Sequence, residues 1–140
     1  MTRTEYWFPG RLSELPAGEC RELMGSTSVG RVAFVDADGP TVFPVNYVLD
    51  GDDVLFRTAP DNTLGRHLEG NPPVAFEVDD FDAYTQTGWS VLVRGTATSM
   101  GTDDVSRDEA LQPFSWAAGR RTQLVRIAPG SVTGQRLLPG

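Results

Sequence analysis

Three side chains that are close in the sequence, Arg57, Arg66 and His67, have the chemistry to bind a ligand or to exchange a proton with it. A guanidinium group offers a fork of N–H donors that matches the oxygens of phosphate or carboxylate, so two arginines could hold one anion. His67 is the only histidine, and histidine is the residue type that exchanges a proton most readily near neutral pH. A simpler interpretation pairs the arginines with Asp61 or Glu69 and leaves His67 as a solvated surface group.

A predicted strand and the short helix after it would position these side chains. Residues 54–58 read as a strand that ends with Arg57 and Thr58. Residues 62–70 read as a helix that Asn62 could cap. Arg66 then lies about one turn into that helix, whose first N–H groups would face the same anion as the arginines. The sequence therefore predicts an anion site where the strand meets the helix.

The residue types present exclude several common chemistries. Lysine and arginine together number twelve, and all twelve are arginine, so no lysine can form a Schiff base or a P-loop phosphate contact. The histidine and cysteine content gives no zinc spacing, and the segment 88–92 (GWSVL) is not a nucleophile elbow. Glu77, Asp79, Asp80 and Asp82 could attract a hard cation, but their spacing fits no calcium loop. We therefore predict a solvated loop and no metal site.

The composition is that of one acidic, soluble domain. With 140 residues and a hydrophobic share of 39%, the chain can build a single core, so residues 1–140 are taken as one domain. Its apolar runs are too short to cross a bilayer. The net charge of −7 has the wrong sign for following a nucleic-acid backbone. One cysteine, Cys20, and an N-terminus without a signal-like apolar segment predict a cytoplasmic protein.

Turn signals divide the chain into many short strands and few helices, which is typical of a small antiparallel barrel or sandwich. A first helix is predicted over residues 16–24, with Cys20 on its buried face. Asp50-Gly51-Asp52 predicts a hairpin turn. Residues 79–87 are interpreted as a surface loop and residues 128–131 as a turn between the last two strands. The predicted strands are 29–35, 41–49, 54–58, 74–78, 89–98, 124–127 and 132–137, with a further helix at 103–112.

Pro44 lies inside the second predicted strand, where it has no N–H to donate to a neighbouring strand. That strand is therefore an edge, is bulged, or turns its backbone toward something other than a strand. Backbone groups that are free of the sheet could bind a heterocyclic ligand. An edge proline that discourages aggregation is an equally good interpretation.

Five segments carry a family resemblance when they are taken in order and spacing. They are 29–34 (VGRVAF), 43–47 (FPVNY), 55–59 (LFRTA), 71–79 (NPPVAFEVD) and 87–91 (TGWSV). Together they resemble the pyridoxamine 5′-phosphate oxidase-like family of FMN-binding split β-barrels. The similarity is greatest to small actinobacterial members near the nitroimidazole-resistance proteins. The fold that this implies is mainly β, a six- to seven-stranded antiparallel split barrel with short helices.

The resemblance also implies a homodimer that holds FMN in a cleft between its subunits. The backbone of the second predicted strand, at Phe43, Pro44, Val45 and Asn46, would face the flavin ring. Trp89 and Ser90 would approach the flavin, from the other subunit. For Trp89 a position in the barrel core is the competing interpretation.

In the same family the phosphate lies at the end of the third predicted strand. This places Arg57 and Thr58 near the phosphate, with Asn62 and Thr63 in the loop that follows and Arg66 as a second guanidinium. Many relatives have a lysine after this strand, whereas this chain has Asn62-Thr63-Leu64. Near the C-terminus a Gln also separates the glycine and arginine that are often adjacent in relatives.

The expected function is that of an FMN-dependent oxidoreductase for a small molecule or NAD(P)H, in which the flavin carries the hydride. The alternatives are a non-catalytic carrier of a flavin, a deazaflavin or haem, and a dimeric barrel that binds none of them. His67 is a candidate for contacting the flavin, donating a proton or ligating haem.

Overall fold

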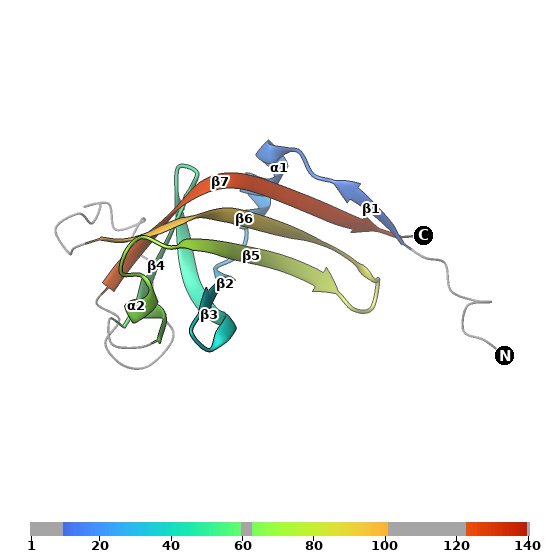
Figure 1. Cartoon of the computed structure of the whole chain (residues 1–140). Coiled ribbons are helices and arrows are strands. Elements are labelled where there is room, and N and C mark those ends of the chain that lie inside the picture. The colour runs from blue at the N-terminus through green and yellow to red at the C-terminus, as the bar shows by residue number, and fades with distance from the viewer. Residues whose placement is uncertain (1–9, 60–62, 101–122, 140) are drawn as a thin grey trace.

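The computed structural model describes residues 10–59, 63–100 and 123–139. These residues form one antiparallel sheet that curves into a barrel, with two short helices at its ends (Figure 1). In chain order the elements are β1 (Arg11–Glu14), α1 (Ala17–Met24), β2 (Val29–Asp36), β3 (Gly39–Asp50), β4 (Asp53–Thr58), α2 (Thr63–His67), β5 (Pro73–Asp82), β6 (Thr87–Met100) and β7 (Gln123–Leu138).

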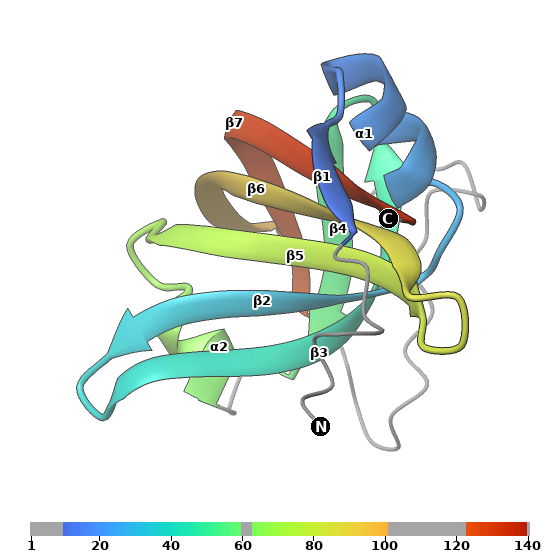
Figure 2. The ribbon, with the colours of Figure 1, turned by 90° about the vertical axis from the view of Figure 1, so that its right-hand side faces the viewer.

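The order of strands shows how the sheet closes. It runs β1-β7-β4-β3-β2-β5-β6, and β6, at the end of this order, also pairs with β7 (Figure 2). This pairing closes strands β7, β4, β3, β2, β5 and β6 into a ring. β1 is added outside the closed ring, along the C-terminal half of β7. The prediction of a six- to seven-stranded antiparallel barrel is therefore confirmed, with seven strands in the described part of the chain.

The β3–β4 hairpin forms where the sequence predicts it. Gly51 has φ +60°, a backbone conformation that glycine adopts without steric cost. The turn brings Tyr47 opposite Phe56 and Asp50 opposite Asp53. The pairing between β3 and β4 does not extend beyond Tyr47 and Phe56. The other edge of β4 pairs with β7, and the part of β3 before Tyr47 pairs with β2.

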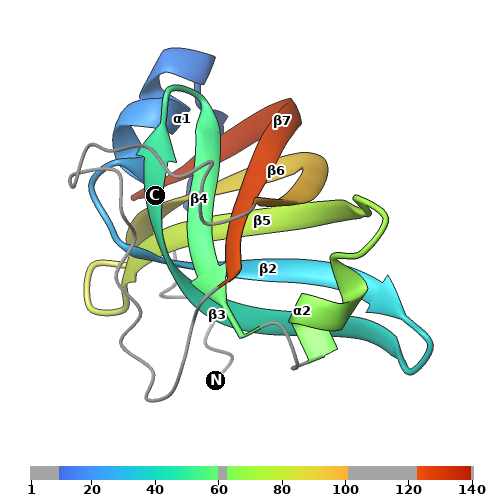
Figure 3. The same cartoon turned by 90° about the vertical axis from the view of Figure 1, so that its left-hand side faces the viewer.

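The core fills the barrel with side chains from alternate strand positions. Fully buried residues include Phe56, Phe76 and Ile127, and burying a side chain of this size stabilises the fold by about 1.5–3 kcal/mol. The helices close the barrel with apolar side chains, Met24 from α1 and Leu64 from α2 among them. Figure 3 shows α2 lying against the β2–β3 hairpin.

The prediction of a surface loop at residues 79–87 is wrong. The acidic segment 79–87 is not a loop, because β5 continues to Asp82 and pairs with β6 through Asp82 opposite Thr87. Its charged side chains tolerate a strand because this part of β5 is largely exposed. The turn between β5 and β6 occupies only residues 83–86. The carboxylate of Asp82 accepts a hydrogen bond from the N–H of Tyr84 at 2.8 Å and stabilises this turn.

The two strands predicted at residues 124–127 and 132–137 form one continuous strand, so this prediction is also wrong. β7 runs from Gln123 through the predicted turn to Leu138. Pro129 lies opposite Gly95 of β6, where the register shifts between Arg94 and Gly95. A shift of this kind lets a strand bend without ending, and it accommodates proline. The sequence interpretation also missed β1, which is four residues long and exposed.

Some predictions concern other parts of the chain. The helix at 103–112 and the capping role of Asn62 lie outside the described residues. Of the two described helices, the longer has eight residues, and neither one has the length and apolar character needed to span a membrane.

Candidate functional site

The two edges of β3 have different surroundings. From Gly39 to Asn46 one edge pairs with β2 in continuous antiparallel register. On the other edge, β4 pairs only with the segment from Tyr47 to Asp50. Between Gly39 and Val45, no strand in the described ranges lies on that side of β3 (Figure 3). We refer to this segment as the open β3 edge.

The side chains of the open β3 edge alternate between the core and the outside. Phe43 and Val45 are half-buried and pack against the core, which fixes the backbone that carries them. Pro44 is exposed and lies opposite Arg31 of β2. Asn46, one pair further on, is half-buried. Of the structures that Pro44 predicted, an edge is the one observed.

The structure places most of the residues predicted to form an anion site on β4 and α2. Arg57 is half-buried on the outward face of β4, and Thr58 is buried at its end. Thr63 and Arg66 are exposed on α2. The helix has five residues, Thr63–His67, and is therefore shorter than the predicted 62–70. A single turn offers few oriented N–H groups, so an anion here would depend on the guanidinium groups.

His67 is not a solvated surface group. Its ring is half-buried and stacks on Phe34 with the centroids 4.3 Å apart and the planes 20° apart. Phe34 in turn stacks on Phe43 at 6.1 Å. The rings of His67, Phe34 and Phe43 thus form a row that connects α2 to the open β3 edge across the β2–β3 hairpin.

Trp89 and Ser90 occupy opposite faces of β6. The Trp89 side chain is 7% exposed and belongs to the core, which is the competing interpretation that the sequence left open. Ser90 is half-buried and lies opposite Asp79 of β5 and Gln135 of β7. Only Ser90 of the two therefore faces the outside of the barrel.

A charged cluster that the sequence interpretation missed joins β2 to β5, on the paired side of β3. One guanidinium nitrogen of Arg31 lies 2.9 Å from Glu77 and 3.3 Å from Asp79. Burial raises the pKa of Glu77 to about 7, and the neighbouring Asp79 adds to the rise, whereas Arg31 opposes it. The one signal in the sequence was the spacing of Glu77 and Asp79, since alternate positions of a strand share a face.

Three side-chain hydrogen bonds hold the end of the barrel beside α1 and the β3–β4 turn. The hydroxyl of Tyr47 donates to the carbonyl oxygen of Met24 and thereby ties β3 to the end of α1. Burial raises the Tyr47 pKa to about 12. Arg126 donates to Asp50 and Asp53, each at 2.8 Å, and these hydrogen bonds raise its pKa. These residues brace the hairpin rather than offering groups to a ligand.

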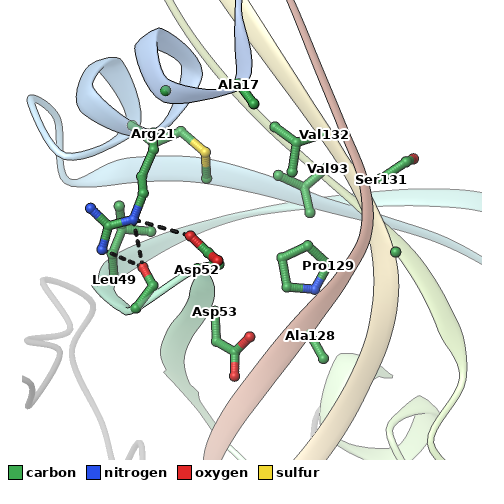
Figure 4. Close-up of a pocket in the computed structure, with 14 residues that line it drawn as sticks. Ala17, Arg21, Leu49, Asp52, Asp53, Val93, Ala128, Pro129, Ser131 and Val132 are labelled. Atoms are coloured by element: carbon green, nitrogen blue, oxygen red, sulfur yellow. Dashed lines mark hydrogen bonds and ion pairs between the residues drawn. The ribbon is translucent and has the colours of Figure 1, made fainter.

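A cleft of about 600 Å³ lies between α1, the β3–β4 turn and the bend of β7 (Figure 4). Arg21 reaches from α1 to the turn, where it donates to the carbonyl oxygen of Gly51 at 2.9 Å and pairs with Asp52 at 3.2 Å. Asp53, on the same rim, is paired with Arg126. The charged side chains that line the cleft are therefore all paired, Arg21 with Asp52 and Asp53 with Arg126.

Cys20 and possible metal ligands add no further chemistry. The Cys20 side chain is fully buried, and burial raises the pKa of its thiol, which disfavours the reactive thiolate. Within the described ranges, no three residues of the His, Cys, Asp and Glu types come together as a metal site would require.

Comparisons with known proteins show which family the chain resembles. The sequence profile described as pyridoxamine 5′-phosphate oxidase matches residues 16–136. An uncharacterised protein of Mycobacterium tuberculosis is 33% identical over 130 residues, which are 89% of this chain and 85% of that protein.

Two solved structures share the fold and nearly a third of the sequence. A FAD-binding protein from Mycobacterium smegmatis is 32% identical with a TM-score of 0.68, and the match covers 90% of this chain and 98% of that one. A Corynebacterium glutamicum protein provisionally assigned as a pyridoxamine 5′-phosphate oxidase is 31% identical with a TM-score of 0.77, covering 96% and 97% of the two chains.

Proposed function

Because the chain belongs to the pyridoxamine 5′-phosphate oxidase family, we propose that it binds FMN at the open β3 edge and acts as an oxidoreductase on a small molecule. The observation that carries this proposal is the edge itself. From Gly39 to Val45 the backbone is held by β2 on one side and has no described strand on the other. Backbone groups fixed in this way are suited to hydrogen-bond the polar edge of a flavin ring.

The residues at this edge fit a flat heterocycle. Phe43 and Val45 turn their side chains toward the core, so the backbone between them can approach a ring closely. Pro44 carries no N–H that would demand a strand partner. Arg31 of β2 lies opposite Pro44 and is exposed, so it brings a polar group to the same outer face of the sheet.

The phosphate of FMN would lie where β4 leads into α2. The protein carries a net charge of −7, so a group with nearly two negative charges needs local positive charge. Arg57 on β4 and Arg66 on α2 are the guanidinium groups nearest this junction in the sequence. They would take the place of the lysine that this chain lacks.

A second copy of the chain would complete the site. The open β3 edge offers one wall to a ligand, and exposed apolar side chains lie on it. Val42 is 61% exposed and Pro44 is also exposed, so apolar surface gathers on the outer face of this strand. Burial of this face against a second copy would bring the partner's outward residues toward the flavin, and Ser90 is the candidate for that role.

When bound, the flavin would supply the redox chemistry by accepting and donating a hydride. The protein's part would be to hold the ring, grip the phosphate and exclude water. A catalytic triad is not required for such a reaction. The substrate and electron donor would be a small molecule and NAD(P)H.

The visible absorption spectrum of the freshly purified protein tests this proposal. We expect a yellow protein whose flavin bands disappear with NADPH in the absence of oxygen and return in air. Calorimetric titration of the apo-protein should show tighter binding of FMN than of riboflavin, since riboflavin lacks the phosphate. A colourless protein that takes up no flavin would refute the proposal.

A flavin carrier is the second candidate, and the absence of any lysine favours it. A carrier would be yellow but would not be reduced by NADPH. A protein loaded with FAD, a deazaflavin or haem would be identified by its own spectrum and by the mass of the released cofactor. Each of these outcomes would replace the FMN assignment while leaving the fold unchanged.

A further inference from the structure

A groove beside α2 carries a second set of groups that could bind a ligand. It has a volume of about 670 Å³, which lies within the usual range of small-molecule sites. Its described lining includes Phe34 and Val35 from β2, His67 from α2, Pro73 from β5 and Arg94 from β6. We call it the α2 groove. The residues proposed above to hold the flavin ring and phosphate are not among its described lining.

Arg94 is the positive charge of the α2 groove. Its side chain is exposed, and within the described residues no carboxylate lies at ion-pair distance from it, whereas Arg21, Arg31 and Arg126 each pair with at least one. Its register neighbours, Ala75 and Ser131, are uncharged. A guanidinium that is exposed and has no acidic partner among the described residues is suited to bind an anion.

His67 adds an ordered ring at another wall of the groove. One face of the imidazole is covered by Phe34, with the centroids 4.3 Å apart, so the orientation of the ring is fixed by packing. The N–H of a fixed imidazole can donate to an anion. Arg94 comes from β6 and His67 from α2, so two donor side chains from different elements border one space.

The remaining surface of the α2 groove is mostly apolar. Val35 is 68% exposed, and Pro72, Pro73 and Ala75 line the same space. A bare inorganic anion would leave this surface in contact with water, whereas a flat hydrocarbon ring would cover it. The combination of an apolar wall with two donors therefore selects a molecule that has both parts.

We propose that the α2 groove binds a small aromatic carboxylate, with its ring against Val35 and the two prolines and its carboxylate on Arg94 and His67. This site is separate from the proposed flavin site. It would give the protein a ligand besides the cofactor and its redox substrate.

The test uses 2-naphthoate as the probe and the neutral alcohol 2-naphthalenemethanol as its control, both at pH 7. Because His67 is the single histidine, its imidazole proton resonances report on the groove without assignment of the rest of the spectrum. We expect saturable shifts with 2-naphthoate and much smaller ones with the alcohol. The shifts should persist when FMN is present at a saturating concentration.

Two variants locate the anion contact. Arg94→Gln should weaken binding about tenfold, the usual effect of losing a charge-assisted hydrogen bond. Val35→Glu, at an exposed position, should weaken it by placing a like charge in the groove. Arg11→Gln, on exposed β1, is the matched control and should bind as the unmodified protein does. Circular dichroism would confirm that each variant is folded.

Three results would overturn the proposal. The first is the absence of saturable shifts at millimolar 2-naphthoate. The second is equal affinity of the Arg94→Gln and Arg11→Gln variants. The third is loss of binding when FMN is added, which would mean that the probe occupies the flavin site instead.

Discussion

Replacing Glu77 with Gln should remove a loss of stability that the protein undergoes as the pH rises. The pKa of Glu77 is raised from 4.5 to about 7 in the folded protein, mainly by burial. The folded state therefore binds this proton more tightly than the unfolded state does. Its contribution to the free energy of unfolding is fully present below pH 4.5 and is lost as the pH rises through about 7.

The size of this effect follows from the pKa difference and from the exposure of the side chain. A rise from 4.5 to about 7 corresponds to at most about 3 kcal/mol. The Glu77 side chain is 34% exposed, so water screens much of this energy. We therefore expect about 1 kcal/mol.

Urea unfolding of the unmodified protein and of Glu77→Gln, at a series of pH values from about 5 to 8, measures this difference. The two proteins should have similar stability at the acid end, and the Gln variant should be the more stable by about 1 kcal/mol at the alkaline end. The protein concentration must be constant, since association with a second copy would also change the apparent stability.

Two further variants serve as controls for the pH effect. Asp79→Asn removes a carboxylate that raises the Glu77 pKa and should reduce the pH dependence. Asp38→Asn, in the exposed β2–β3 turn, should leave it unchanged. A Glu77→Gln variant that is less stable than the unmodified protein at pH 8, or a difference that does not vary with pH, would refute the reasoning.

Two other predictions test the site and the packing. Arg57→Ala should weaken FMN binding about tenfold or more through loss of a charge-assisted contact, whereas Arg11→Ala should not; calorimetry giving equal affinities would exclude Arg57 from the phosphate site. Gly30→Ala should destabilise the fold by about 1–3 kcal/mol, because its Cβ would lie 2.3 Å from the ring of Phe76. A Cβ added at Gly18 in α1 meets no atom within 4 Å, so Gly18→Ala should be neutral or slightly stabilising. Thermal unfolding measures the stability of both glycine variants.

The parts of the fold that were predicted correctly are those with strong local signals. The β3–β4 hairpin combines alternating apolar residues with a glycine at the turn, and both agree with the observed register. In β7, by contrast, Pro129 and its neighbours have the composition of a turn. Only the pairing with β6 across Gly95 makes them part of a strand. That pairing depends on residues far apart in the sequence, which local patterns do not report.

The candidate site shows the same division. Pro44 alone was enough to limit β3 to an edge, a bulge or a backbone turned away from its neighbours, because a missing N–H has a local consequence; the edge was one of these three. The contact between Arg31 and Glu77 joins residues 46 positions apart and exists only because β2 and β5 pair in one particular register. The stacking of His67 on Phe34 likewise depends on where α2 packs, so the sequence left this histidine as a solvated residue.

The pairing of β1 with β7 has a consequence for the connectivity of the chain. Arg11 lies opposite Leu138, so the first and last strands run side by side at one corner of the barrel. A short flexible linker could join them, while new ends could be opened in the turn at residues 83–86, where Tyr84 is 96% exposed. Such a circular permutant would keep all the described strand pairings and should fold to the same barrel.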